Sequence, residues 1–266
     1  MIQGRLLSLP FDFLDGEFLV VSGSTDPAVE SGIESPRSHT AHVVRELGQG
    51  IVSGRHAQHG VLPGDAELMQ RFGVSRTVLR EALRVLAGKG LVQAKARIGT
   101  RVRDRAEWNL FDRDVLLWHA HAGFDAAFLM HLSEMRMALE PEAAALAAER
   151  RTPLQLQQLY AHVDRMGAEG ASPADFVTAD LNFHLAVSVA AANPFLRSIA
   201  TLIEVALVGL LTISSPADEP VRLAKSIASH RAIADAIARR DPDLARAAMM
   251  VVIEEGVVMA RIRKGR

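Results

Sequence analysis

The chain has 266 residues, of which 49% are hydrophobic and 23% charged, so predominant disorder is excluded and two domains are expected. It contains no cysteine, which excludes disulfides, cysteine-ligated zinc and cysteine nucleophiles and suits a cytoplasmic protein. Its 30 basic and 31 acidic side chains give a formal net charge of −1, and its apolar runs are shorter than the roughly 18 residues of a membrane span.

The charge is distributed unevenly along the chain. Residues 38–105 carry 12 basic and 5 acidic side chains, net +7, whereas residues 1–37 and 106–266 each carry a net charge of −4. This asymmetry favours a polyanionic partner for the basic segment, the alternative being a random fluctuation. Residues 1–37 have scattered glycine, proline and serine without periodicity and no signal-peptide pattern, so we expect a flexible N-terminal extension.

The basic segment, residues 38–105, has the element order of a winged helix-turn-helix. Apolar residues recur at helical spacing in residues 43–51 and 65–72, and Ser75 is placed to cap a third helix that ends near Gly88. Two short strands, residues 91–94 and 100–102, are expected to follow as the wing.

The third helix carries the side chains that suit DNA recognition. Arg76 and Arg80 are four residues apart and project from one face near its N-terminal end, which is the part of a recognition helix that reaches base edges. An arginine fork matches the two acceptors of guanine, and Ser75 and Thr77 are placed to bond phosphates. The alternative is a solvated basic face.

The same segment resembles the DNA-binding domain of the GntR family. The resemblance rests on residues 74–83 (VSRTVLREAL), 90–92 (GLV) and 99–102 (GTRV). It implies that Arg76, Arg80 and the wing glycine, Gly99, contact the operator; Ala66 stands where many members have an arginine. The predicted DNA-binding residues are Ser75, Arg76, Thr77, Arg80, Lys95, Arg97, Gly99 and Thr100.

Residues 106–123 are expected to form a linker helix. They contain both tryptophans of the chain, Trp108 and Trp118. Such a helix would pack on both domains; the alternative is that the tryptophans only fill a core.

Residues 124–262 predict an all-α bundle of six to seven helices. The expected helices are residues 124–149, 153–167, 173–192, 195–213, 219–239 and 242–262. A proline marks five of the boundaries between them, and no strand-like alternation competes. Ligands of such bundles bind between facing helices.

Three polar residues within this bundle are candidate metal ligands. Asp180 and His184 are one helical turn apart and point to one spot, and His230 follows two helices later. A carboxylate with imidazoles suits zinc, nickel or manganese. A purely structural hydrogen-bonded pair is the alternative.

The bundle resembles the FCD effector domain of the FadR subfamily. The matching segments are residues 134–141 (EMRMALEP), 180–184 (DLNFH), 193–194, 230 and 239–241. Many such domains bind a metal through one aspartate and three histidines, so the resemblance implies Asp180, His184 and His230 as ligands. The third histidine would fall at Val252, which leaves a site of three ligands, a site completed by water or effector, or a metal-free site that binds the effector directly.

Arg136 is the remaining candidate, because a guanidinium facing the bundle interior would anchor a carboxylate. The alternative is a surface salt bridge to Glu140. The segment of residues 108–118 (WNLFDRDVLLW) also resembles the galactonate-operon repressors within this subfamily, which implies a sugar-acid effector.

The sequence therefore predicts a ligand-responsive transcription factor and not an enzyme. We expect a homodimeric repressor that binds a pseudo-palindromic operator in double-stranded DNA and loses affinity when a small carboxylate binds near Arg136, Asp180, His184 and His230. Two alternatives are a metal-dependent enzyme acting on a small acid and an architectural DNA-binding protein without a ligand.

Overall fold

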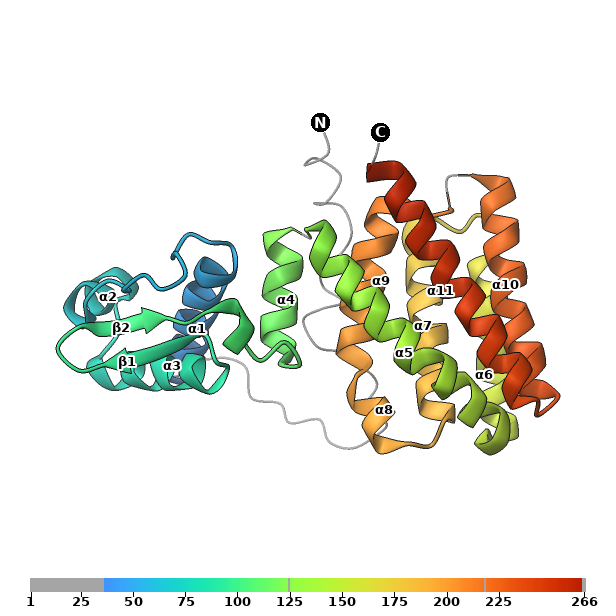
Figure 1. Cartoon of the computed structure of the whole chain (residues 1–266), viewed down its shortest axis with the longest axis horizontal. Coiled ribbons are helices and arrows are strands. Elements are labelled where there is room, and N and C mark those ends of the chain that lie inside the picture. The colour runs from blue at the N-terminus through green and yellow to red at the C-terminus, as the bar shows by residue number, and fades with distance from the viewer. Residues whose placement is uncertain (1–35, 124, 218, 265–266) are drawn as a thin grey trace, which may run out of the picture. The chain divides into compact units, whose positions relative to one another are not determined.

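The structure is a computed structural model that describes residues 36–123, 125–217 and 219–264. The chain divides after Gly123 into two compact units, coloured blue to green and green to red in Figure 1. The predicted extension over residues 1–37 lies outside the described residues, except that residues 36 and 37 begin the first helix. The prediction of a mainly helical fold is confirmed, and no helix in the described ranges is long and apolar enough to cross a membrane.

The first unit is a winged helix-turn-helix. Its helices are α1 (Pro36–Val52), α2 (Asp65–Phe72), α3 (Arg76–Gly88) and α4 (Arg113–Ala122), and its wing pairs β1 (Val92–Lys95) with β2 (Gly99–Val102) in antiparallel register. Gly73 ends α2 at a φ of 63°, a conformation that glycine adopts without strain. The Ser75 hydroxyl caps α3 by accepting from Val78 N at 3.4 Å, as the sequence predicts.

The segment between the wing and the second unit is only partly helical. The predicted helix over residues 106–123 is limited to α4, preceded by a 3-10 turn at Arg105–Glu107, because Asp112 caps α4 by accepting from the backbone of Asp114 and Val115. α4 packs on α1, and both tryptophans are buried in the first unit's core. The main residues of this core are Leu47, Ile51, Leu68, Leu79, Leu86, Leu91, Trp108, Val115 and Trp118.

The second unit is an all-α bundle (Figure 1). Its helices are α5 (Ala126–Arg150), α6 (Pro153–Met166), α7 (Pro173–Ala190), α8 (Pro194–Ser198), α9 (Ala200–Ser214), α10 (Pro220–Ala238) and α11 (Pro242–Lys264). Five of them begin at a proline, whose missing N–H costs nothing in the first turn. The single helix predicted over residues 195–213 is wrong: Ser198 bonds back to the Pro194 carbonyl at 2.9 Å, and the chain turns there from α8 into α9.

The core of the bundle forms around α5, which packs against α7, α9, α10 and α11, while α6 packs against α7 and α10. Its largest buried members are Leu159, Met166, Phe176, Phe183, Ile233, Ile237, Met249 and Ile253. The polar candidates for the site lie inside this apolar frame.

Candidate DNA-binding surface and metal-binding pocket

The predicted DNA-binding residues of the first unit lie on α3 and on the wing. Ser75, Arg76, Thr77 and Arg80 are exposed. Thr77 and Arg80 line a cavity of about 610 Å³, together with Thr100 of β2. The recognition helix and the wing therefore meet along one shallow depression.

The turn of the wing has an unusual backbone. Lys95, Arg97 and Gly99 are exposed, and the positive φ values of Arg97 (63°) and Gly99 (108°) allow the chain to reverse within a few residues. A side chain is disfavoured at the φ of Gly99. The turn thus presents Arg97 on a compact backbone that is able to approach a groove.

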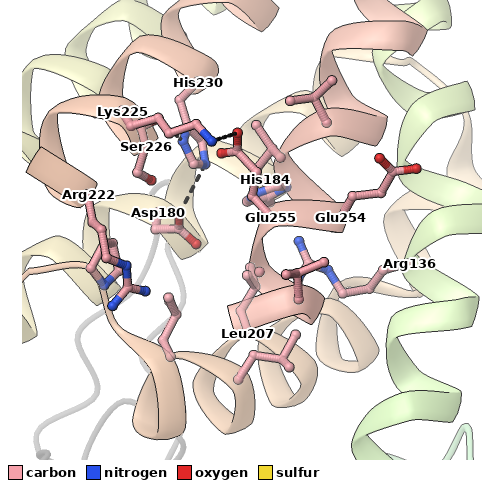
Figure 2. Close-up of a pocket in the computed structure, with 17 residues that line it drawn as sticks. Arg136, Asp180, His184, Leu207, Arg222, Lys225, Ser226, His230, Glu254 and Glu255 are labelled. Atoms are coloured by element: carbon pink, nitrogen blue, oxygen red, sulfur yellow. Dashed lines mark hydrogen bonds and ion pairs between the residues drawn. The ribbon is translucent and has the colours of Figure 1, made fainter. Parts of the chain in front are cut away.

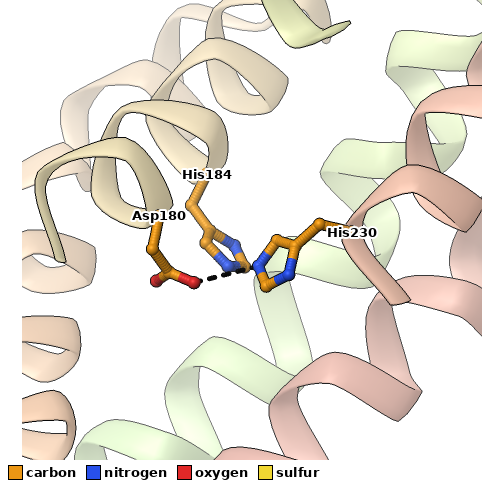
Figure 3. A group of neighbouring side chains, drawn as sticks. All are labelled: Asp180, His184 and His230. Atoms are coloured by element: carbon orange, nitrogen blue, oxygen red, sulfur yellow. Dashed lines mark ion pairs between the residues drawn. The ribbon is translucent and has the colours of Figure 1, made fainter. Parts of the chain in front are cut away.

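The three candidate metal ligands come together in the second unit. Figure 3 shows Asp180 and His184 on α7 facing His230 on α10. Their ligand atoms lie within 4.8 Å of one another, and the three residues are at most 3% exposed. Asp180 Oδ1 is 3.0 Å from His230 Nε2.

Both histidines are held through Nδ1, which leaves Nε2 for a ligand. His230 Nδ1 donates to the Ser226 carbonyl at 2.7 Å, and His184 Nδ1 contacts Glu140. Such outer-shell acceptors are typical of metal-ligating histidines, since they fix the ring orientation. Among the described residues, Asp180 Oδ2 and His184 Nε2 have no hydrogen-bond partner although both are buried. Within the same part of the chain, His184 Nδ1 and His230 Nε2 are also buried without a hydrogen bond, and their contacts with Glu140 and Asp180 are ion pairs.

The Asp180 carboxylate beside His230 Nε2 favours a positive charge between these two side chains. Because Nδ1 of His230 carries a hydrogen, Nε2 beside the carboxylate must hold either a proton or a metal. Burial acts to lower the pKa of His230, but the Asp180 carboxylate outweighs it and the pKa is raised. Burial likewise acts to raise the pKa of Asp180, and the charge of His230 reverses this and lowers it. The donor set therefore fits a divalent transition metal.

Glu140 belongs to the site although sequence analysis treats it only as a salt-bridge partner. It is buried on α5 and contacts both Arg136 Nε and His184 Nδ1. Burial acts to raise the pKa of this carboxyl, but Arg136 and His184 together lower it to about 2. The pair of Arg136 and Glu140 does form, in the interior and not at the surface; their spacing of one helical turn was the available signal.

A cavity of about 470 Å³ opens beside the cluster (Figure 2). This volume lies in the range of small-molecule sites, about 300–1,000 Å³. Arg136, Asp180, His184 and His230 all line it, so the structure brings the four predicted effector residues together. Val252 lines it as well and offers no ligand atom. The lining residues that sequence analysis missed include Arg222, Lys225, Ser226 and Glu255.

A winged helix-turn-helix joined to a helical bundle, whose internal pocket holds a buried cluster of charged side chains, defines a DNA-binding transcriptional regulator with an effector domain. The family "Bacterial regulatory proteins, gntR family" matches residues 39–102, and the FCD domain family matches residues 131–255. The chain belongs to the GntR family and carries an FCD domain.

Named relatives and a solved structure agree with this assignment. The chain is 33% identical to the galactonate operon transcriptional repressor of Escherichia coli (strain K12), over 80% of this chain and 93% of that protein. It is 34% identical to the transcriptional repressor NanR of Cronobacter sakazakii, over 78% of this chain and 79% of that protein. The solved structure of Lar, which controls the Listeria monocytogenes agr system, shares the fold with a TM-score of 0.55 and 21% identity, covering 84% of this chain and 96% of that one.

The relatives are regulators, which agrees with the prediction that the chain is not an enzyme. The alternative of a metal-dependent enzyme is therefore excluded.

Proposed function

We propose that the protein is a homodimeric repressor whose affinity for a pseudo-palindromic operator falls when a small carboxylate, a sugar acid, binds in the pocket of the second unit. The observation that carries this proposal is the pocket itself, which joins a buried guanidinium to a carboxylate–imidazole cluster. The galactonate operon repressor and the NanR repressors among the relatives support the sign of regulation, and the first of them also supports the class of effector.

In the first unit, Arg76 and Arg80 would read base edges in the major groove from the exposed N-terminal part of α3. Ser75 and Thr77 would bond phosphates beside the helix N-terminus, since the Ser75 hydroxyl still has a hydrogen to donate while it caps α3. The wing residues Lys95, Arg97, Gly99 and Thr100 would follow the neighbouring backbone or minor groove. In a two-fold dimer, the two winged helix-turn-helix units would bind the two half-sites of the operator.

In the second unit, Asp180, His184 and His230 would hold a divalent metal such as zinc, nickel or manganese. When bound, the metal supplies a Lewis-acidic positive charge that attracts the effector's carboxylate. Arg136 lines the same cavity and would donate to that carboxylate through the N–H groups that do not contact Glu140. Because Val252 cannot ligate, water or the effector would complete the coordination.

The effector would act by shifting a population. It favours a dimer arrangement in which the two recognition helices no longer match two half-sites, and operator affinity falls by the ratio of its affinities for the two arrangements. An architectural DNA-binding protein, by contrast, would bind its operator equally well with and without any acid.

DNA recognition is tested with a fragment selected by the wild type from a random duplex library. Fluorescence anisotropy should show a loss of affinity of about 5–150-fold for Arg76→Ala and for Arg80→Ala, as expected from about 1–3 kcal/mol per bidentate base contact. Arg165→Ala removes an exposed arginine of the second unit and serves as the control. Unchanged affinity in both α3 variants would show that α3 is not the recognition helix.

The metal and the effector are tested on the full-length protein. After dialysis against zinc, elemental analysis should find metal in the wild type and in His131→Ala, which alters an exposed histidine, but less in His184→Ala. Galactonate should then release operator DNA from the wild type and far less from Arg136→Ala. A metal-free wild type disproves the metal, and release that is intact in Arg136→Ala makes Arg136 structural.

A further inference from the structure

We propose that α10 forms a hydroxyl-binding wall of the effector pocket, in which Arg222 selects polyhydroxylated acids over alkyl carboxylates of the same length. This inference rests on the proposed function, since it concerns the far end of a ligand whose carboxylate lies at Arg136 and the metal cluster. It assigns a second recognition point in the pocket and a chemical class of ligand.

The α10 side of the pocket is polar throughout. The residues of α10 that line the cavity are Arg222, Lys225, Ser226 and His230. Their spacing of three, one and four residues puts them on one face of the helix, so they follow one another along the cavity. His230 stands at the cluster, and Arg222 lies two helical turns earlier; Figure 2 shows Arg222 on the opposite side of the pocket from Arg136.

The wall formed by α9 is apolar. α9 contributes Leu207, Leu210 and Leu211, whereas α11 contributes Val251, Val252 and Val258 together with the carboxylates of Glu254 and Glu255. A ligand lying between α9 and α10 meets hydrocarbon on one side and hydrogen-bonding groups on the other. An open-chain sugar acid has both kinds of surface, because its C–H bonds and its hydroxyl groups can face opposite ways.

The charges on α10 favour neutral hydroxyl groups over a second carboxylate. Arg222 Nη1 donates to Glu219 at 3.1 Å, and Lys225 Nζ lies 3.0 Å from Glu255. Each cation is therefore balanced by a carboxylate, as Arg136 is by Glu140, but the proposed metal adds positive charge at the Arg136 end of the pocket and not at Arg222. A guanidinium has five N–H donors, so the pairing with Glu219 is compatible with further bonds to a ligand.

The position of Arg222 makes its polar atoms costly to leave unbonded. Its side chain is only 18% exposed in the described structure. An alkyl chain placed against it would displace water and return no hydrogen bond, whereas hydroxyl groups replace those bonds. Sites built to bond a substrate hydroxyl discriminate strongly against the analogue that lacks it.

Isothermal titration of the full-length, zinc-loaded protein with galactonate and hexanoate tests the proposal, because both acids have six carbons and one carboxylate. We expect the wild type to bind galactonate at least about tenfold more tightly, a small share of the discrimination that hydroxyl-binding sites reach. Arg222→Leu should lose most of this preference by weakening galactonate alone. Glu219→Gln, the matched control, removes the partner carboxylate and should keep the preference.

Three other results would overturn the proposal, and each has a different meaning. Equal wild-type affinities for the two acids, or equal losses for both in Arg222→Leu, would overturn the hydroxyl-binding wall and leave the proposed function standing. Much tighter binding of galactarate, the corresponding diacid, would replace the wall with a second carboxylate site. If no acid binds the wild type, the proposed function fails as well. Should Arg222→Leu not fold, Ser226→Ala serves instead and should weaken galactonate and not hexanoate.

Discussion

Replacing Lys89 by methionine should destabilise the whole first unit, because the Lys89 side chain links the C-terminal end of α3 to the start of α4 through ion pairs. Lys89 Nζ lies 2.8 Å from both carboxylate oxygens of Asp112 and 2.7 Å from Asp114, and its side chain is 13% exposed. The ammonium also lies 5.8 Å from the centre of the Trp118 ring, a cation–π distance. Methionine keeps the apolar stem and removes only the charge.

The magnitude follows from the burial of the three partners. Breaking a fully buried ion pair costs about 3–5 kcal/mol, and an exposed pair contributes about 0–1 kcal/mol. Asp112 is 22% exposed and Asp114 49%, so the arrangement lies between these limits. We expect the free energy of unfolding of the first unit to fall by about 2–3 kcal/mol, which for a unit of this size lowers its melting temperature by roughly 10–20 °C.

Tryptophan fluorescence isolates this transition, because both tryptophans of the chain, Trp108 and Trp118, are buried in the first unit's core. Arg84→Met is the control: its side chain is 82% exposed and it pairs with Glu81 only at 3.8 Å, so a change within about 0.5 kcal/mol is expected. If the first unit of Lys89→Met melts at the same temperature as that of Arg84→Met, the ion pairs contribute nothing to stability and the reasoning from burial is wrong.

Three further substitutions probe the two units. Gly48→Ala should destabilise the first unit by at least about 2 kcal/mol, because a Cβ would lie 2.4 Å from the Trp118 ring; tryptophan fluorescence during urea unfolding measures it, and Gly88→Ala, in open space, is the control. Glu140→Gln should weaken zinc binding about 10–100-fold by removing the charged partner at Nδ1 of His184, a proposed zinc ligand; competition with a chelator measures this, and an unchanged affinity would contradict it. Val252→His should increase the affinity for zinc, since this position lines the pocket; an affinity no higher than that of the wild type would show that the added imidazole does not reach the metal.

The local features of the fold were predictable because they depend on neighbours in the sequence. The Ser75 cap, the stop at Gly73 and the prolines that begin helices each act within one turn of the chain, and the structure has all of them. The placement of Asp180 and His184 in one cluster is of the same kind, since one helical turn separates them. The exception is the break at Ser198, where a side chain competes with the helix.

The non-local parts of the site could not be predicted in the same way. Nothing near Glu140 in the sequence indicates that its second oxygen meets His184, because that contact depends on how α5 packs on α7. The polar face of α10 is visible as spacing, but Arg222, 18% exposed, would be an ordinary surface residue if the neighbouring walls of the pocket did not enclose it. The expected linker helix is shorter for a similar reason: Asp112 begins α4 where Lys89 holds it.

In the proposed function, Glu140 couples the binding of the metal to the binding of the effector. Its two carboxylate oxygens contact Arg136 and His184, so one rigid, buried group orients both the proposed carboxylate anchor and a proposed metal ligand. Any change in the bonds of Arg136 on effector binding alters the charge that Glu140 presents to the imidazole, and metal binding alters what it presents to the guanidinium. Because binding free energies are reciprocal, the factor by which zinc tightens effector binding must equal the factor by which the effector tightens zinc binding. In Glu140→Gln this factor should move toward one, a result that a merely structural role for the carboxylate would not produce.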